Sequence, residues 1–441
     1  MSEQQPAPSP APAPAGEGQD SPQGQPGRPR PAERAGETAR ALINAVVEGS
    51  PAVVTLLAIV AALVLGALLI AFTDTTVLHA WSQLFSHPGH AFAQAWNSIS
   101  AAYSALFDGA IFSPATIGAA FHGGSVGAIF YPISQSMSDA TPLILTGLSV
   151  AIAFRAGLFN IGAAGQWIGG AIVAAYLGFA VSMPPVIHVI VCLIGGIAGG
   201  AVVGGVVGEL KARTGAHEVI VTIMLNYVMY QLLSYVLGTP KALQAPGQSN
   251  LISPNIAANA QLPHVGGPPP QVDVGFLVAL AAAAVVGWLL TRSTVGFEFR
   301  TVGANPNAAR SAGMSVERSW VLVMLIAGAL AGLSGASVIQ GSAVHALTFN
   351  SYGTYGFDGI TVALLGRARP GGVVLAALLF GALHSGGTTM QAVTSVPTDI
   401  AQVIQGLIVL FVAAPPLIRA VFRLRQARAG GLEAVAKGWN G

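Results

Sequence analysis

Long apolar runs limit what this chain can fold into more than any other feature of its sequence. Several are long enough to cross a hydrocarbon layer of ~30 Å as helices. Four examples are residues 51–72, 161–181, 186–208 and 320–339. Only 8% of the 441 residues are charged, whereas about 25% are charged in soluble domains. The sequence therefore predicts an all-α fold, a polytopic transmembrane helical bundle.

The two ends of the chain differ in composition from the middle. Residues 1–45 are rich in Pro, Ala and Gly and lack apolar periodicity, which predicts a disordered tail. The first long apolar run begins only after Gly49, so we expect a retained anchor helix rather than a cleaved signal peptide. We assign the transmembrane permeation domain to residues 46–416 and a basic cytoplasmic tail to residues 417–441.

The distribution of Lys and Arg predicts the topology, because basic loops are retained in the cytoplasm. No basic residue occurs between residues 41 and 154. The 73–140 and 239–273 segments are therefore expected outside, with Lys241 as the one exception. The basic segments expected inside are both termini, 209–217, 292–318 and 367–370.

About ten crossings satisfy this pattern and leave both termini in the cytoplasm. Two of them, 141–155 and 356–366, are too short to span a bilayer in regular form, since a helix rises only about 1.5 Å per residue. Short segments interrupted by glycine are typical of broken helices that line a transport site. The ten segments are 51–72, 141–155, 161–181, 186–208, 218–238, 274–291, 319–341, 356–366, 371–391 and 397–415.

The stretch FRAGLFNIGAAGQ, residues 154–166, places polar side chains between two apolar segments. Its glycines permit a tight reversal of the chain. Asn160 and Gln166 are then expected to face protein or a cavity rather than lipid. Two roles remain open for these amides: they satisfy backbone groups freed by the broken helix, or they contact a solute on its path.

Intramembrane carboxylates are sparse, and such groups are usually functional because burying them in lipid is costly. Glu218 is expected to be an acidic residue in the first turn of a helix, favoured by the helix dipole, with a functional role as the alternative. Asn226, about two turns further along, is a candidate contact on the solute path. Asp358 either caps a half-helix or contacts the solute path. Asp139 and Asp399 are expected near outer helix ends. So few carboxylates argue against a proton or sodium pump and suit a neutral, polar solute.

A further sequence pattern predicts the close packing of two helices. Glycines recur every fourth residue along one helix face, which lets a neighbouring helix approach closely; they are Gly196, Gly200, Gly204 and Gly208.

The cytoplasmic segment TVGANPNAARSAGM predicts a two-turn helix. Asn305 is suited to its N-cap, Pro306 to its first position and Gly313 to the residue past its end. Ala309 and Arg310 lie within it. This helix is either a small surface element or a coupling helix that docks on a partner ATPase.

Several chemistries find no support in the sequence. It contains no zinc-protease motif and no phosphate-binding loop with its lysine. His79, His87, His90 and His122 are spread through the external segment, as surface histidines are. We therefore expect no catalytic residue, no metal, no cofactor and no nucleic acid partner, and we expect any ATP hydrolysis to occur on another subunit.

Four motifs together resemble the permease subunits of ATP-binding cassette importers of the ribose and branched-chain amino acid type. They are GLFNIGAAGQ, EVIVTIMLNYV, TVGANPNAARSAGM and GFDGITVALLGRARPGGVVLAALLFGAL, and the resemblance covers about residues 50–415. It is greatest to the nucleoside-uptake branch. One departure is Ala164, because the family usually carries a glutamate at this position.

The resemblance implies a bacterial cytoplasmic membrane protein that works in a larger assembly. Its implied partners are a second homologous permease, an ATPase subunit and an extracytoplasmic substrate-binding lipoprotein. The expected solute is a nucleoside, with a simple sugar such as a pentose as the alternative. A stand-alone secondary transporter is the alternative of a different class, and it would need neither ATP nor a docking helix.

Overall fold

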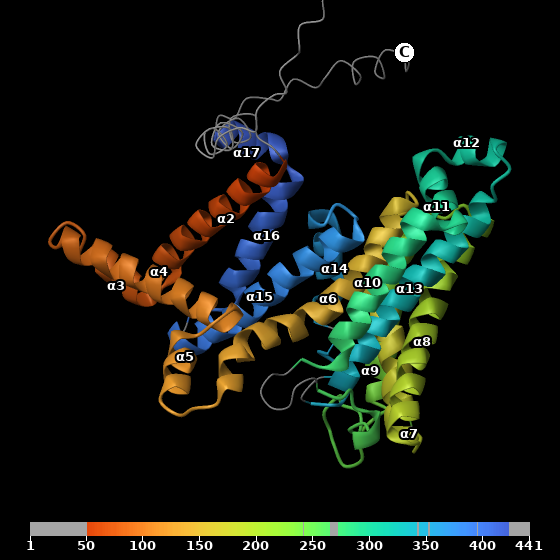
Figure 1. Cartoon of the computed structure of the whole chain (residues 1–441), viewed down its shortest axis with the longest axis horizontal. Coiled ribbons are helices and arrows are strands. Elements are labelled where there is room, and N and C mark those ends of the chain that lie inside the picture. The colour runs from red at the N-terminus through yellow and green to blue at the C-terminus, as the bar shows by residue number, and fades with distance from the viewer. Residues whose placement is uncertain are drawn as a thin grey trace, which may run out of the picture. The chain divides into compact units, whose positions relative to one another are not determined.

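The computed structural model describes residues 51–240, 242–264, 272–341, 344–351, 353–394 and 396–422. Residues 54–422 of this set fall within one compact unit, which is helical throughout its regular structure (Figure 1). The tail assigned to residues 1–45 and all but the first six residues of the basic tail, 417–441, lie outside the described residues.

The described part contains eight helices that are long and apolar enough to cross a membrane, or nine if one bent pair counts as a span. Two shorter apolar helices, α14 and α16, add to them. All ten segments expected from the sequence coincide with helices, which confirms the polytopic helical bundle. The ten helices are α2 (Pro51–Thr73), α6 (Tyr131–Arg155), α7 (Ala163–Ala180), α8 (Pro185–Thr214), α9 (Glu218–Leu237), α10 (Val274–Arg292), α13 (Val316–Gly341), α14 (Tyr355–Leu365), α15 (Pro370–Thr394) and α16 (Asp399–Ala413).

Helix α6 is longer than its sequence predicts. The expected 141–155 segment was too short to span, but the helix begins at Tyr131 and has 25 residues. Its first ten residues, YPISQSMSDA, contain several polar side chains and therefore do not form an apolar run. The Ser136 hydroxyl is satisfied by donating to the carbonyl of Ala110 at 2.6 Å. Polar residues can therefore extend this helix because neighbouring backbone accepts their hydrogen bonds.

The segment expected to lie outside, 73–140, holds further helices before α6 begins. Helices α4 and α5 are bent by 60° at a short break and form the one pair that could act as a broken span. Trp81 of α3 stacks on Phe72 and meets Phe92 edge to face, which joins α2, α3 and α4. The elements of this segment are α3 (Thr75–Ser82), α4 (Pro88–Ala110), α5 (Pro114–Phe121) and a 3₁₀ turn η1 (Val126–Phe130).

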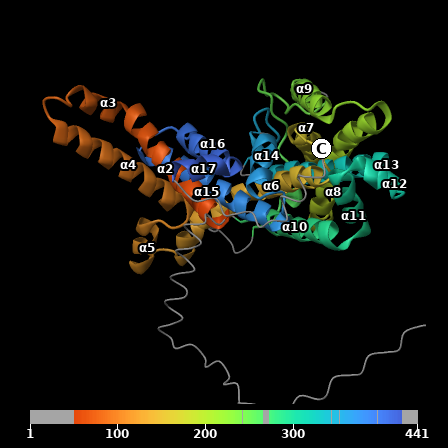
Figure 2. The same cartoon turned by 90° about the horizontal axis from the view of Figure 1, so that it is seen from above.

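Helices α8 and α13 form the closest pair in the fold, and they lie side by side in two perpendicular views (Figures 1 and 2). The glycine stripe of α8 makes this approach possible. A Cβ atom at Gly200 would overlap the backbone of Gly328 and Gly332 on α13. The other stripe residues, Gly196, Gly204 and Gly208, also face α13 at distances that leave no room for a side chain.

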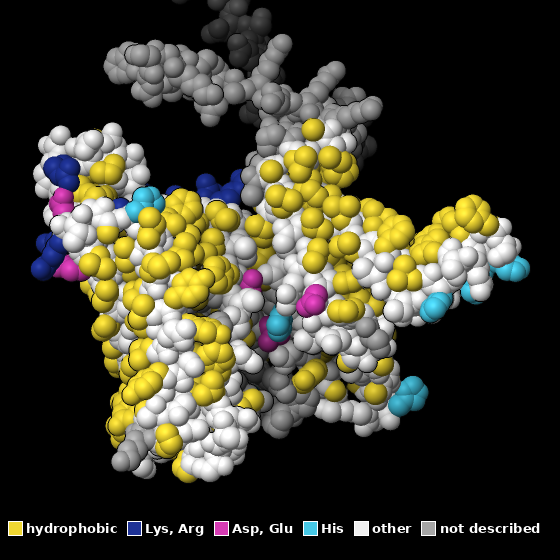
Figure 3. Space-filling model, turned by 180° about the vertical axis from the view of Figure 1, so that it is seen from behind, with side chains coloured by type: hydrophobic (Ala, Val, Ile, Leu, Met, Phe, Trp, Pro, Cys, Tyr) yellow, Lys and Arg dark blue, Asp and Glu magenta, His cyan; other side chains and the backbone are white. Residues whose placement is uncertain are grey.

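Loops at the two ends of the bundle agree with the predicted sides of the membrane. Helices α12 (Pro306–Ser311) and α17 (Pro415–Val421) both lie at the upper end in Figure 1, where α11 (Thr294–Ala304) also ends. The 242–264 segment, which contains the 3₁₀ turn η2 (Ala258–Ala260), lies at the opposite end. Apolar side chains cover the flanks of the bundle in Figure 3, as a lipid-facing surface requires.

Candidate functional site

The turn between α6 and α7 is held together by a pair of buried amides. Asn160 and Gln166 are both fully buried. The Asn160 Nδ2 group donates to Gln166 Oε1 at 2.9 Å, and Gln166 Nε2 donates back to Asn160 Oδ1 at 3.1 Å. The same Asn160 oxygen accepts from the backbone N–H of Gly162 at 3.0 Å. In this structure both amides therefore contact protein groups.

Asn226 ties helix α9 to the same turn. Its Oδ1 accepts from the backbone N–H of Gly165 at 2.8 Å, and its Nδ2 donates to the carbonyl of Ile161 at 2.9 Å. These two bonds satisfy backbone groups around the start of α7 that the helix itself leaves unpaired. A contact between solute and any of the three amides stays a prediction.

Glu218, at the start of α9, forms an ion pair beside this turn. Its Oε2 lies 2.7 Å from Lys211 Nζ, and both side chains are largely buried. The ammonium group of Lys211 also lies 4.7 Å from the ring centroid of Trp320. The carboxylate thus links α8 to α9 as a structural contact.

Ala164, where the resembled family usually carries glutamate, supports the first turn of α14. A Cβ atom at Gly356 would overlap the backbone and side chain of Ala164, so the two helices meet with only a methyl group between them. Gly356 has no room for a side chain against Ala164, which sets how closely α7 and α14 approach. The small residue is therefore matched to this close approach.

Asp358 lies one turn into α14 and binds neighbouring side chains. It accepts a hydrogen bond from Thr354 Oγ1, the N-cap residue, and another from Gln405 Nε2 of α16 at 3.2 Å. These contacts combine a helix-capping role with a link between helices. A contact with solute stays a prediction for this residue as well.

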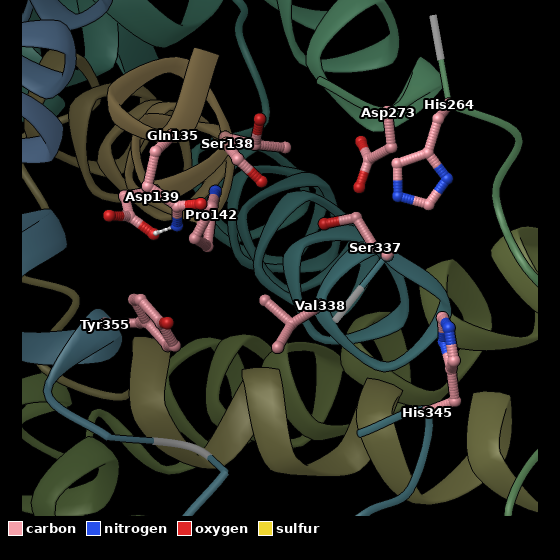
Figure 4. A pocket seen from close by; sticks show the side chains of 12 residues that line it. Gln135, Ser138, Asp139, Pro142, His264, Asp273, Ser337, Val338, His345 and Tyr355 are labelled. Carbon is pink, nitrogen blue, oxygen red and sulfur yellow. Dashed lines mark hydrogen bonds between the residues drawn. The ribbon is translucent and has the colours of Figure 1, made fainter. Parts of the chain in front are cut away.

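A polar cavity of about 460 Å³ lies between α6, α13 and α14 (Figure 4). This volume is within the range of about 300–1,000 Å³ that small-molecule sites occupy. The segments 242–264 and 344–351 contribute His264 and His345 to its lining, so the cavity lies toward the end of the bundle opposite α12. Its lining residues are Gln135, Ser138, Asp139, Thr141, Pro142, His264, Asp273, Ser337, Val338, Gly341, His345 and Tyr355.

One end of the cavity combines a carboxylate with an aromatic ring. Asp139 of α6 projects into it and accepts from Gln135 Nε2 at 3.2 Å (Figure 4). Tyr355, the first residue of α14, faces the same space. Its ring stacks on Trp167 of α7, with centroids 6.2 Å apart and planes inclined by 28°. The amide-held start of α7 therefore forms the support behind this end of the cavity.

The other end contains Asp273, His264 and His345 (Figure 4). Asp273 is only 6% exposed, and its Oδ1 has no hydrogen-bond partner among the described residues. Burial raises the pKa of Asp273 above its ordinary value, and burial lowers the pKa of His345. Both shifts favour the uncharged forms, which suits hydrogen bonding to a neutral solute. Across the described residues, no group of His, Cys, Asp or Glu is arranged to hold a metal ion.

Sequence reasoning missed most of this cavity. Asp139 was expected only near an outer helix end, and the lining residues His264, Asp273 and Tyr355 carried no motif. One signal was available, because Gln135 and Asp139 are four residues apart and share one face of a helix. The remaining residues come from loops and helix ends that only the folded chain brings together.

The predicted two-turn helix is present as α12, and its ends follow the sequence. Docking of an ATPase on it stays a prediction. Asn305 Oδ1 accepts from the backbone N–H groups of Asn307 and Ala308 at 3.0 and 3.1 Å. Gly313, just past the end, has φ of 83°. Ala309 is fully buried against Val302 and Val316.

The rest of α12 is exposed. Arg310 pairs with Glu317 at 2.5 Å on its open side. The helix therefore presents a small, firmly anchored surface at the end of the bundle where the basic loops lie.

Comparisons with known proteins agree with the geometry. Residues 132–413 match the family described as "Branched-chain amino acid transport system / permease component". The guanosine ABC transporter permease protein NupP of Bacillus subtilis is 38% identical over 330 residues, which cover 74% of this chain and 88% of that protein.

Two other relatives differ in the solutes that they are named for. The nucleoside ABC transporter permease protein NupB of Lactococcus lactis is 34% identical, over an alignment that covers 67% of this chain and 82% of that protein. The glucose ABC transporter permease protein TsgB13 of Haloferax volcanii is 35% identical, with coverages of 64% and 76%. No solved structure matches the chain. On its helical bundle and its family match, the chain is a multi-pass membrane protein that belongs to the family of permease components of branched-chain amino acid type ABC transport systems.

Proposed function

We propose that this permease carries a nucleoside into the cytoplasm through the cavity between α6, α13 and α14. The observation that supports it most is the lining of that cavity, with a carboxylate and an aromatic ring at one end and hydroxyl and imidazole groups at the other. An aromatic face suits a flat base, and polar groups suit ribose hydroxyls. Two relatives named for guanosine and nucleosides support the same solute class.

The proposal includes an assembly in the bacterial plasma membrane. A partner ATPase would hydrolyse ATP and dock on α12, and a second homologous permease would complete the translocation path. An extracytoplasmic lipoprotein would deliver solute to the external end, where the cavity lies. The anchored and exposed surface of α12 supports the docking step, because a rigid helix can transmit motion to the bundle.

We also propose that Asn160, Gln166 and Asn226 act as positioning residues. They fix the first turn of α7. In this helix the ring of Trp167 stacks on Tyr355, and Ala164 packs against Gly356 of α14. Asp358 would hold α14 against α16 in the same manner. A shift of α14 relative to α7 would then change the shape of the cavity during transport.

A sugar is the second candidate solute, favoured by the relative named for glucose. The deciding experiment expresses the permease together with an ATPase, a second permease and a substrate-binding lipoprotein from its own genome. Uptake of labelled guanosine, uridine, ribose and glucose is then measured with an active ATPase and with one inactivated in its phosphate-binding lysine. We expect uptake of nucleosides that requires the active ATPase. Uptake of sugars alone, or uptake that is independent of the ATPase, would contradict the proposal.

A further inference from the structure

We propose that Asp139 selects the base of the transported nucleoside, by accepting the adjacent N1–H and N2–H groups of a guanine ring. This inference rests on the proposed nucleoside function and adds the chemical class of the preferred base. It also assigns a specific role to a carboxylate that lines two cavities.

The carboxylate of Asp139 is open to a ligand on one side. Gln135 donates to Oδ1 at 3.2 Å, and this is the hydrogen bond that the described residues make to the group. Oδ2 has no donor among them. The residue lines the solute cavity and also borders a second cavity of about 440 Å³, which contains His384 of α15. In its ionised form the carboxylate only accepts hydrogen bonds, and a ligand with adjacent N–H or O–H donors on its open side would stabilise that form.

The ring of Tyr355 defines the plane in which such a ligand would lie. One face of the ring is covered by Trp167, which is fully buried and so fixes the ring. Figure 4 shows Tyr355 across the cavity from Asp139. A flat heteroaromatic ring can stack on an aromatic side chain, and here its edge would point toward the carboxylate. The hydroxyl of Ser337 and the Asp273 group lie farther along the cavity, where the ribose would extend.

Donor geometry then discriminates among bases. Guanine presents two adjacent N–H donors, at N1 and N2, that match the two oxygens of a carboxylate. Hypoxanthine presents one such donor, at N1, with only a C–H beside it. In uracil and xanthine the corresponding N–H lies between two carbonyls, and a carboxylate repels the carbonyl that replaces the second donor. A site built to accept a pair of donors rejects a ligand that lacks one of them, because a buried polar group is then unpaired. The expected order of uptake is guanosine, then inosine, then uridine and xanthosine.

A purely structural role for Asp139 makes a different prediction. Asp139 and His384 of α15 line the second cavity together, and the carboxylate could serve only to hold α6 against α15. Loss of the charge would then lower the yield of the complex and reduce the uptake of every nucleoside by the same factor. Base choice would in that case lie entirely in the lipoprotein.

The test is the Asp139→Asn variant in the assembled transporter, with uptake measured per recovered complex. An amide keeps one acceptor and gains a donor, so it matches the N1–H and C2 carbonyl of xanthine. We expect the ratio of guanosine to xanthosine uptake to fall by roughly tenfold or more, in keeping with the discrimination that a bidentate contact gives. Uridine uptake should change in the same direction as xanthosine uptake, because the N3–H of uracil also lies beside a carbonyl that the amide can match. Asp108→Asn is the matched control, since Asp108 lines the second cavity but not the solute cavity.

The outcomes separate this inference from the proposed function. No nucleoside uptake by the unaltered complex would refute the proposed function itself. Nucleoside uptake with an unchanged guanosine-to-xanthosine ratio in Asp139→Asn would overturn only the role of Asp139. If Asp139→Asn does not assemble, Asp139→Ser is measured instead, because serine is smaller and uncharged. A preference for guanosine over inosine that survives in Asp139→Ser would overturn the inference as well.

Discussion

At the scale of single residues, the buried amide pair of Asn160 and Gln166 offers a direct test of how the α6–α7 turn is built. In Asn160→Ala, the Gln166 amide and the Gly162 N–H would both lose their partners. A buried polar group left unpaired costs about 1–3 kcal/mol. We therefore expect lower thermal stability and yield, with near-normal uptake per recovered complex.

The control for this variant is Asn97→Ala, because Asn97 is an exposed asparagine on α4. Thermal unfolding of the purified complex and uptake of labelled nucleoside are measured for both. Normal stability of Asn160→Ala together with greatly reduced uptake per complex would instead assign Asn160 a contact with the solute.

The residues of the candidate site show how far single-sequence reasoning reaches. The polar turn around Asn160 was visible because amides interrupt an apolar stretch, and the structure places it beside the cavity rather than in it. Tyr355 and Asp273 could not be predicted, since each lies at a helix start and gains its role only from helices distant in sequence. The sequence therefore predicts polar residues that interrupt an apolar segment, but the residues that form the cavity depend on tertiary packing.

At the scale of helices, long apolar runs predicted where the membrane-spanning elements lie, but not always how long they are. All ten expected segments are helices, and the glycine stripe of α8 lies against α13. The length of α6 was wrong, because Ser136 and its neighbours hide a helix whose polar groups bond to other backbone. Helices α3 to α5 were missed within the 73–140 segment, since only the folded chain shows how their apolar faces are paired.

Helix α12 allows a test of coupling, because its two ends depend on particular side chains. Loss of the Asn305 cap costs a helix about 1 kcal/mol, and a valine at Gly313 would be strained at a φ of 83°. In the double variant Asn305→Ala, Gly313→Val, we expect the permease to remain in the membrane. Co-purification of the ATPase and ATP-dependent uptake should both fall.

The matched control is Gly215→Val, which strains another cytoplasmic loop at a φ of 69° outside α12. It should leave ATPase co-purification intact. Full retention of ATPase binding and uptake in the α12 double variant would show that this helix is only a surface connection.

At the scale of the whole molecule, the arrangement of helices assigns each loop to a side of the membrane. The loops after α8 and α10 carry the basic residues and lie at the end of α12, whereas the 242–264 segment lies at the opposite end (Figure 1). His264 of that segment lines the solute cavity, which therefore lies toward the opposite end. If the basic loops are cytoplasmic, the cavity faces the source of an imported solute.

This orientation can be measured because the chain has a single cysteine, Cys192, which is fully buried. A charged maleimide that cannot cross a bilayer should therefore leave the unaltered protein unlabelled. Ser249→Cys adds an exposed thiol to the external segment, and Thr214→Cys adds one at the cytoplasmic end of α8. In intact cells we expect labelling of Ser249→Cys alone, and after permeabilisation labelling of both. Labelling of Thr214→Cys in intact cells would show the opposite topology. The cavity would then face the cytoplasm, as an exporter would require.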